Sequence, residues 1–260
     1  MQKRILCLLF LIAGVLLFQS VQAQTVLFAD GTGTPPGTPT HIDVPPPSFT
    51  RTVSATGLID ESIVLARSGG TITGTGDLTL NVTGSGTQVL NAVGTGSLIS
   101  MDGKTVINMT NAPNATTDNN RGAYANLGTV ILNTGSTITL KGAGSQEFRN
   151  NRGVEADHEG ATLTATGTTI DMEGSRQIGA FAHGAATELG GGVVSLTGCN
   201  IKLTGDDGYG LGTQSGSSTQ PPHPTTVSAT NTQINMIGDR NICAVSFDGA
   251  VILTNCPMLL

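Results

Sequence analysis

The chain has 260 residues, a net charge of −6 and few charged side chains, while glycine accounts for 36 residues and tryptophan for none. The acidic balance excludes a nucleic-acid partner, because phosphate binding needs basic clusters and the sequence has none. Such a composition fits either a disordered linker or a regular β structure with small residues at its turns, and only periodicity distinguishes the two.

Residues 1–23 are predicted to form a secretory signal peptide. Lys3 and Arg4 precede an apolar run from Ile5 to Phe18, and Val21-Gln22-Ala23 supplies a small-residue cleavage site. The run is shorter than the roughly 20 residues of a membrane-spanning helix. We therefore expect cleavage after Ala23 and export of residues 24–260, with 10 basic residues left against 18 acidic ones once Lys3 and Arg4 are removed.

Residues 24–50 are predicted to form a Pro/Gly-rich leader. From Asp30 to Thr50 the sequence reads DGTGTPPGTPTHIDVPPPSFT, and repeated prolines remove backbone donors and favour extended, unpaired chain. From Arg51 onward, apolar residues alternate with Thr, Ser and Asn, as in TITGTGDLTLNVTG. This is the period-two pattern of β-strands, so we expect an all-β domain over residues 51–260.

An internal repeat occupies the second half of the chain. Each copy has an apolar residue, an isoleucine seven positions later, Leu or Met two further on, and then glycine after two more. The copies are VILNTGSTITLKG, TLTATGTTIDMEG, VVSLTGCNIKLTG and TVSATNTQINMIG, which begin their patterns at Ile131, Leu163, Val194 and Val227. A fifth copy is expected to use Ile252 and Leu259. From Ile107 onward the isoleucines are 31, 32, 31 and 33 residues apart, and such a period indicates a solenoid.

A short phrase of glycine and small residues precedes each copy. The phrases are GAYA at Gly122, GVEA at Gly153, GAFA at Gly179 and GLGT at Gly210, and Cys243 takes the place of the glycine in the fifth. Each period therefore offers three short strands, which excludes helical repeats and four-stranded propeller blades. The prediction is a right-handed parallel β-helix.

The repeat also predicts the direction of each side chain. The isoleucine and the Leu or Met of each copy should point inward and stack at the strand spacing of about 4.8 Å; they are Ile138, Leu140, Ile170, Met172, Ile201, Leu203, Ile234 and Met236. Their neighbours Thr139, Asp171, Lys202 and Asn235 should face water. Gly142, Gly174, Gly205 and Gly238 should form corners with positive φ.

The three cysteines that follow the signal peptide are Cys199, Cys243 and Cys256. An odd number cannot all pair within one chain. Either two of them pair and one is left over, or all three are buried as small apolar residues. Their spacing to one another and to histidine does not fit a metal site.

The signal peptide followed by copies such as GAFAHGAATELGGGVVSLTGCNIKLTGDDGYGL resembles the passenger regions of bacterial autotransporters, of the pertactin-like, pectin-lyase-like β-helix type. The resemblance covers residues 121–260 well and residues 51–120 loosely. It implies type V export through the periplasm and display at the cell surface, or release, of an elongated adhesin-like stalk associated with virulence.

The sequence departs from this family at its end. An autotransporter carries a C-terminal transmembrane β-barrel with two aromatic belts, and the few scattered aromatic residues here do not supply one. We expect the β-helix to end within its fifth ladder, as a truncated or split product or as a freestanding relative. Contact with the outer membrane would then need a barrel that this chain lacks.

Carboxylates in two glycine-bounded turns are the candidates for catalysis, namely Asp157 with Glu159, and Asp206 with Asp207. Glycoside hydrolysis needs two carboxylates facing one cleft, whereas turn carboxylates are usually solvated. His158 and His183 can lie near one another on adjacent coils as metal ligands, but lone loop histidines are usually solvated too. We therefore assign no catalytic residue, no metal and no cofactor.

The function expected from these observations is that of a non-enzymatic, adhesin-like passenger that binds a host surface or extracellular-matrix receptor or a glycan. The alternative is a carbohydrate-active β-helix enzyme, a polysaccharide lyase or hydrolase. A cluster of carboxylates and basic residues on one outer face of neighbouring coils would favour the enzyme, and its absence would favour the passenger.

Overall fold

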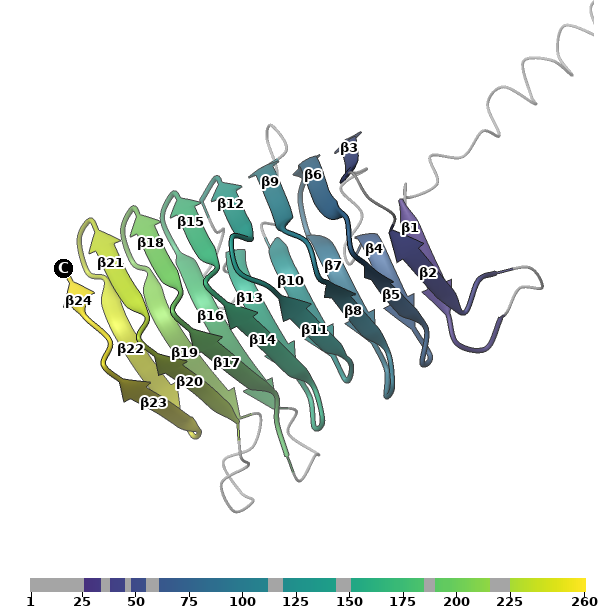
Figure 1. Cartoon of the computed structure of the whole chain (residues 1–260). Helices are drawn as coiled ribbons and strands as arrows, with labels where there is room; N and C mark the ends of the chain where they lie inside the picture. Colours follow the sequence, from purple (N-terminus) through teal and green to yellow (C-terminus); the bar gives the residue numbers. More distant parts are fainter. Residues whose placement is uncertain are drawn as a thin grey trace, which may run out of the picture.

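The computed structural model describes residues 26–33, 38–44, 48–54, 61–111, 119–143, 151–184, 190–215 and 225–260. These residues contain no helix, and their strands form three parallel sheets of eight strands each. The chain visits the three sheets in turn, so that successive coils stack side by side from the N-terminal to the C-terminal end (Figure 1). The fold is a parallel β-solenoid, as the repeat predicts, and its right-handed sense stays a prediction.

Each sheet takes every third strand. Sheet A contains β1 (Leu27–Asp30), β4 (Glu61–Arg67), β7 (Thr87–Val93), β10 (Arg121–Asn126), β13 (Asn151–Asp157), β16 (Gln177–Gly184), β19 (Tyr209–Ser215) and β22 (Ile242–Phe247). Sheet B contains β2 (His41–Val44), β5 (Thr71–Gly74), β8 (Leu98–Met101), β11 (Thr129–Leu132), β14 (Thr162–Thr166), β17 (Val193–Thr197), β20 (Thr226–Thr230) and β23 (Ala250–Thr254). Sheet C contains β3 (Ser48–Ser54), β6 (Asp77–Gly84), β9 (Thr105–Asn111), β12 (Thr137–Lys141), β15 (Thr169–Glu173), β18 (Asn200–Thr204), β21 (Gln233–Ile237) and β24 (Met258–Leu259).

The solenoid begins before residue 51, inside the stretch expected to be an unpaired leader. Strand β1 pairs with β4 and strand β2 pairs with β5, with Ile42 opposite Ile72. In the sequence, the prolines that suggested a leader fall between strands β1, β2 and β3 and not within them. The predicted signal peptide lies outside the described residues.

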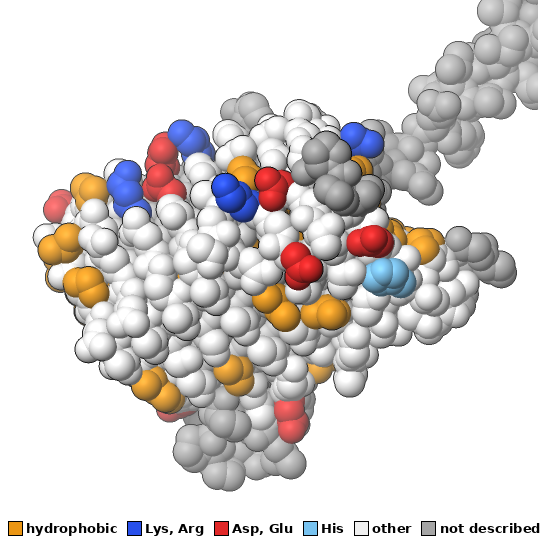
Figure 2. All heavy atoms as spheres, viewed as in Figure 1, with side chains coloured by type: hydrophobic (Ala, Val, Ile, Leu, Met, Phe, Trp, Pro, Cys, Tyr) orange, Lys and Arg blue, Asp and Glu red, His pale blue; other side chains and the backbone are white. Residues whose placement is uncertain are grey.

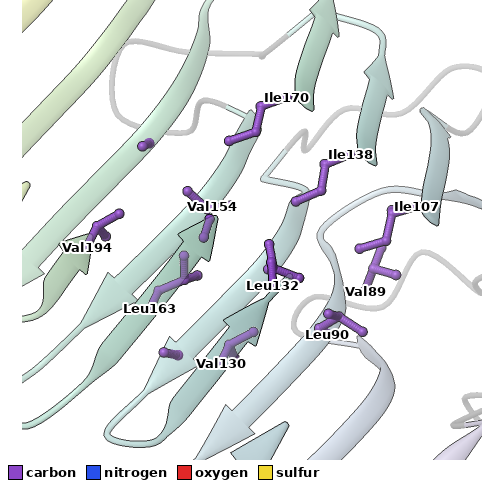
Figure 3. Close-up of a cluster of buried hydrophobic side chains, with 14 of the residues drawn as sticks. Val89, Leu90, Ile107, Val130, Leu132, Ile138, Val154, Leu163, Ile170 and Val194 are labelled. Carbon is purple, nitrogen blue, oxygen red and sulfur yellow. The ribbon is translucent and has the colours of Figure 1, made fainter. Parts of the chain in front are cut away.

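The isoleucine ladder of sheet C holds the core together. Ile107, Ile138, Ile170, Ile201 and Ile234 are direct partners from strand to strand, and each is 0% exposed. Burying one such side chain contributes about 1.5–3 kcal/mol. The neighbouring Leu and Met positions are buried as well, so every predicted inward residue is confirmed. Figure 3 shows part of this ladder facing buried side chains of the other two sheets.

The alignment of the first and fifth copies was wrong by one residue. Val130, not Ile131, is the partner of Leu163, and Ile131 is only half-buried. In the last coil Val251 and Met258 take the inward positions, whereas Ile252 and Leu259 face outward and are exposed. Two apolar residues stand side by side at each of these places, so a spacing of seven cannot choose between them.

Glycines provide the space that the isoleucines occupy. A Cβ atom on Gly153 would lie 2.5 Å from Cγ2 of Ile170 and 2.6 Å from the carbonyl oxygen of Gly179. Gly122 and Gly179 stand in the same relation to Ile138 and Ile201. The glycine of each repeat phrase is therefore required by packing. The predicted corner glycines Gly142, Gly174, Gly205 and Gly238 all have positive φ, between 120° and 140°.

All three described cysteines are free thiols, and Cys199 and Cys243 are buried while Cys256 is half-buried. Cys199 donates to the carbonyl of Ala165, and Cys256 donates to that of Ala229. The interpretation with a disulfide is therefore wrong, and the interpretation that all three are buried holds for Cys199 and Cys243 but not for Cys256. Cys199 and Cys256 fill corner positions between strands, whereas Cys243 lies within strand β22.

The C-terminal coil exposes apolar side chains. Within the described residues, every exposed large hydrophobic side chain lies between Ile237 and Leu260. Strands β22, β23 and β24 each have a neighbour on one side only, so this end presents unpaired backbone as well. Elsewhere on the face seen in Figure 2, charged side chains are sparse and the surface is mostly uncharged.

Separate substitutions of one inward residue and of its outward neighbour test the register of the strands. Ile170→Asp should abolish cooperative unfolding near neutral pH, because it places an unpaired charge in a stacked apolar ladder. Asp171→Ser, at the next position, should change the unfolding free energy by about 0.5 kcal/mol or less. Urea unfolding of both variants measures this, and equal effects would mean that the register is shifted by one residue.

Candidate functional site

A polar groove lies on the outer face of sheet A. It encloses about 450 Å³ and is lined by Asn119, Arg121, Arg152, Glu155, Asp157, His183 and Gln214. These residues define the sheet A groove. Most of them come from strands β10, β13, β16 and β19, which are consecutive neighbours in the sheet.

Strand register brings the groove residues together. Arg121 is the direct partner of Arg152, and Tyr124 is the partner of Glu155, which in turn faces Phe181. A third row runs through Asp157, His183 and Gln214. Residues about one repeat apart in sequence thus become neighbours at the strand spacing of about 4.8 Å.

The buried side-chain amides of two asparagines hold in place the start of the strands that carry Arg121 and Arg152. The side-chain oxygen of Asn120 accepts the backbone N–H of Thr87 at 2.9 Å, and that of Asn151 accepts the N–H of Asn120 at 3.1 Å. Both amides are 0% exposed. Each asparagine directly precedes an arginine of the groove, so these hydrogen bonds hold the backbone of both arginines in place.

Glu155 lies between the two arginines. The Nε of Arg121 donates to Oε2 of Glu155, and Nη1 of Arg152 donates to Oε1 at 2.7 Å. The side chain of Glu155 is 1% exposed. One carboxylate therefore offsets the repulsion between two adjacent guanidinium groups, and removing it would leave buried charge without a partner, at a cost of about 3–5 kcal/mol.

Aromatic rings support both guanidinium groups. The guanidinium carbon of Arg121 lies 4.4 Å from the ring centroid of Tyr124, and that of Arg152 lies 4.8 Å from the ring centroid of Phe181. Burial alone would lower the pKa of Arg121, but the negative charge of Glu155 outweighs it and the pKa is raised. Arg121 therefore stays charged.

Asp157 connects a tyrosine and a histidine. The hydroxyl of Tyr124 donates to Oδ2 of Asp157 at 2.8 Å, and Nδ1 of His183 lies 2.7 Å from Oδ1. Burial, followed by the charges of Glu155 and Asp157, raises the pKa of Tyr124. Tyr124 consequently remains a hydrogen-bond donor at any physiological pH.

The same contacts keep Asp157 ionised. Burial acts to raise its pKa, but the hydrogen bond and charge of His183 and the hydrogen bond of Tyr124 prevail and lower it to about 2. An ionised carboxylate only accepts hydrogen bonds, so Nδ1 of His183 carries the proton. The other ring nitrogen, Nε2, has no partner within the described part of the chain, and 30% of the side chain is exposed in the groove.

The structure separates the four candidate carboxylates. Asp157 lies in the groove, whereas Glu159 is exposed in the following turn and packs over Gly190. Asp207 forms a bidentate pair with Arg240 at 2.6 and 2.9 Å, and Asp206 accepts the backbone N–H of Asp239. Asp206 and Asp207 therefore stabilise the corner between β18 and β19.

The two histidines named from the sequence do lie on adjacent coils. Asp157 stands between them, because Nε2 of His158 is 3.7 Å from its Oδ2 and His183 binds its Oδ1. In the described ranges, however, no group of three or more His, Cys, Asp or Glu side chains is arranged to hold a metal ion.

Arg121, Tyr124, Arg152 and Glu155 were not identified from the sequence. They occupy variable positions of the first two repeat phrases, RGAYAN and RGVEAD, which are followed by IGAFAH and YGLGTQ. Aligning these phrases on their glycines places the outward residues in columns, and those columns are the rows of the groove. The glycines and alanines of these phrases carry the repeat, and the variable residues between them carry the groove.

Comparison with protein-family models, curated proteins and solved structures found no match to this chain. The part of the chain that the structure describes has no helix long and apolar enough to cross a bilayer. The groove must therefore be interpreted from its own chemistry.

The lowered pKa of Asp157 predicts a specific loss of stability in acid. A carboxylate with a depressed folded-state pKa stabilises the protein above its unfolded pKa of 3.8, and this contribution is lost as the pH falls toward about 2. It amounts to about 2 kcal/mol. Urea unfolding should show wild type more stable than Asp157→Asn near neutral pH by about this amount, with the difference vanishing near pH 2.

Tyr124→Phe provides the companion variant for this measurement. It removes one donor to Asp157 while keeping the ring beneath Arg121, so the pKa of Asp157 should rise, and the stability that is lost in acid should be smaller than in wild type but larger than in Asp157→Asn. A wild-type advantage that persists unchanged to about pH 2 would contradict the assignment.

Proposed function

We propose that this chain is an exported, adhesin-like passenger of a type V system that binds a glycan or a receptor of a host surface or extracellular matrix through the sheet A groove. The acidic net charge argues against nucleic acid as the partner. The right-handed β-helix and the route through the periplasm to the cell surface belong to the same proposal, which rests on the sequence resemblance.

The observation that carries the binding role is the groove itself. Polar and charged groups line about 450 Å³ on the face of a sheet, and their positions are set by strand register. Ion pairs and buried hydrogen bonds hold most of these side chains in place. A binding site built in this way is preorganised, so a ligand does not have to order it.

An enzymatic role is the second candidate, because the groove is a cluster of carboxylates and basic residues on one outer face of neighbouring coils. The details favour binding over hydrolysis. A glycoside hydrolase needs a carboxylic acid that is protonated near neutral pH, whereas Glu155 is held by two arginines and the pKa of Asp157 is about 2. A catalytic role would instead depend on His183 as a base, as a lyase requires.

Binding of residues 24–260 to arrays of glycans and matrix proteins tests the proposal. The double variant His183→Ala with Gln214→Ala should weaken binding to any captured ligand by about tenfold, equivalent to about 1.4 kcal/mol. Lys202→Ala, on the outer face of sheet C, is the matched control and should bind as wild type does.

Two results would contradict this proposal. Binding that the groove variants leave unchanged would place recognition elsewhere on the solenoid. Cleavage of a bound polysaccharide, seen as new chain ends by mass spectrometry and lost in His183→Ala, would favour the enzyme.

A further inference from the structure

The carboxylate oxygens of the groove are already occupied. Both oxygens of Glu155 accept from arginines, and both oxygens of Asp157 interact with Tyr124 or His183. The groove amides of Asn119 and Gln214 can donate or accept equally. Each carboxylate oxygen of the groove is therefore already engaged by a donor group of the protein.

Donor groups remain available. Arg152 contacts Glu155 through Nη1, while its Nε is buried without a hydrogen-bond partner in the described structure. Of the five N–H donors of an arginine, Arg152 uses one on Glu155 within the described residues. Because Nε is buried, the remaining Nη donors are the ones that a ligand can reach. The ring of His183 adds Nε2, whose opposite nitrogen is anchored by Asp157.

Phe181 sets the distance between these two donor groups. The guanidinium of Arg152 lies over its ring, and the ring of His183 is stacked against it with a centroid distance of 6.2 Å and an interplanar angle of 15°. A ligand that reaches both must extend past the aromatic ring, which a saccharide unit with groups on both sides can do.

We propose that the groove binds a carboxylate-bearing glycan, with the carboxylate on Arg152 and a sugar hydroxyl on Nε2 of His183. The planar guanidinium fork matches a carboxylate in a way that an ammonium does not. Arg121, Arg152, Glu155 and Asp157 sum to no net charge, so short-range hydrogen bonds rather than long-range attraction hold the ligand. This inference rests on the proposed function and specifies its ligand.

Calorimetric titration of residues 24–260 tests the ligand class. The probes are a hyaluronan oligosaccharide, the same oligosaccharide with its carboxylates reduced to alcohols, and sialyllactose as a different source of carboxylate. The reduced oligosaccharide should bind at least about tenfold more weakly than hyaluronan. Sialyllactose then shows whether a terminal carboxylate suffices or a chain of uronate units is needed.

Variants test whether the groove is responsible for the stronger binding of the carboxylate-bearing oligosaccharide. Arg152→Lys retains the positive charge but loses the fork, and it should reduce hyaluronan affinity by about tenfold while the reduced oligosaccharide is unaffected. The control Lys202→Gln removes a positive charge on sheet C, outside the groove, and should leave both affinities unchanged. Urea unfolding of each variant verifies that the fold persists, and the comparison of the two oligosaccharides on wild type does not depend on any variant folding.

The outcomes separate the inference from the proposed function. Equal binding of both oligosaccharides, sensitive to His183→Ala, would overturn the carboxylate assignment and retain a glycan-binding groove. Hyaluronan binding that Arg152→Lys and His183→Ala leave unchanged would overturn the assignment of the groove. Failure of every glycan and matrix protein to bind would reject the proposed function itself.

Discussion

From Ile138 to Ile234, each inward isoleucine of sheet C lies against its equivalent one coil away and against a glycine of sheet A. This contact sets the register of both sheets, because a side chain at Gly153 would meet Ile170 and the next backbone together. The repeated pairing of Ile138 with Ile170 and Ile201 follows from it. Where Cys243 replaces the glycine, the inward partner is Met258 rather than isoleucine, and the coil there is also the one that exposes apolar side chains.

The outer groove is a consequence of the same register. Once Gly122, Gly153 and Gly179 are aligned by packing, the residues that flank them have to form rows on the outside. Arg121 then stands beside Arg152, a repulsive arrangement that Glu155 neutralises from the next row. The core thus determines where charged groups meet, and the variable outward residues determine what they can bind.

The sequence was sufficient to predict the parallel solenoid, the inward ladder and the corner glycines, because apolar side chains that stack in register must recur at a fixed period. It misplaced Ile131 and Ile252, since a neighbouring apolar residue satisfies the same spacing. Proline content concealed β1 and β2, although prolines between strands do not prevent pairing. Of the groove, Asp157 and His183 were named from the sequence, together with the neighbouring His158, but the ion pairs of Glu155 depend on rotamers and on contacts between two adjacent coils, which no periodicity specifies.

Disulfide trapping tests the register most directly. In a chain whose native cysteines are replaced by serine, Thr139→Cys and Asp171→Cys occupy outward partner positions on β12 and β15, at a Cα separation of about 4.8 Å that suits a disulfide. Thr139→Cys with Lys202→Cys spans two strand spacings, roughly 10 Å, which exceeds the limit of about 7 Å. Mild oxidation should cross-link the first pair and leave the second pair as free thiols. Efficient cross-linking of the second pair, or none in the first, would contradict the parallel in-register solenoid.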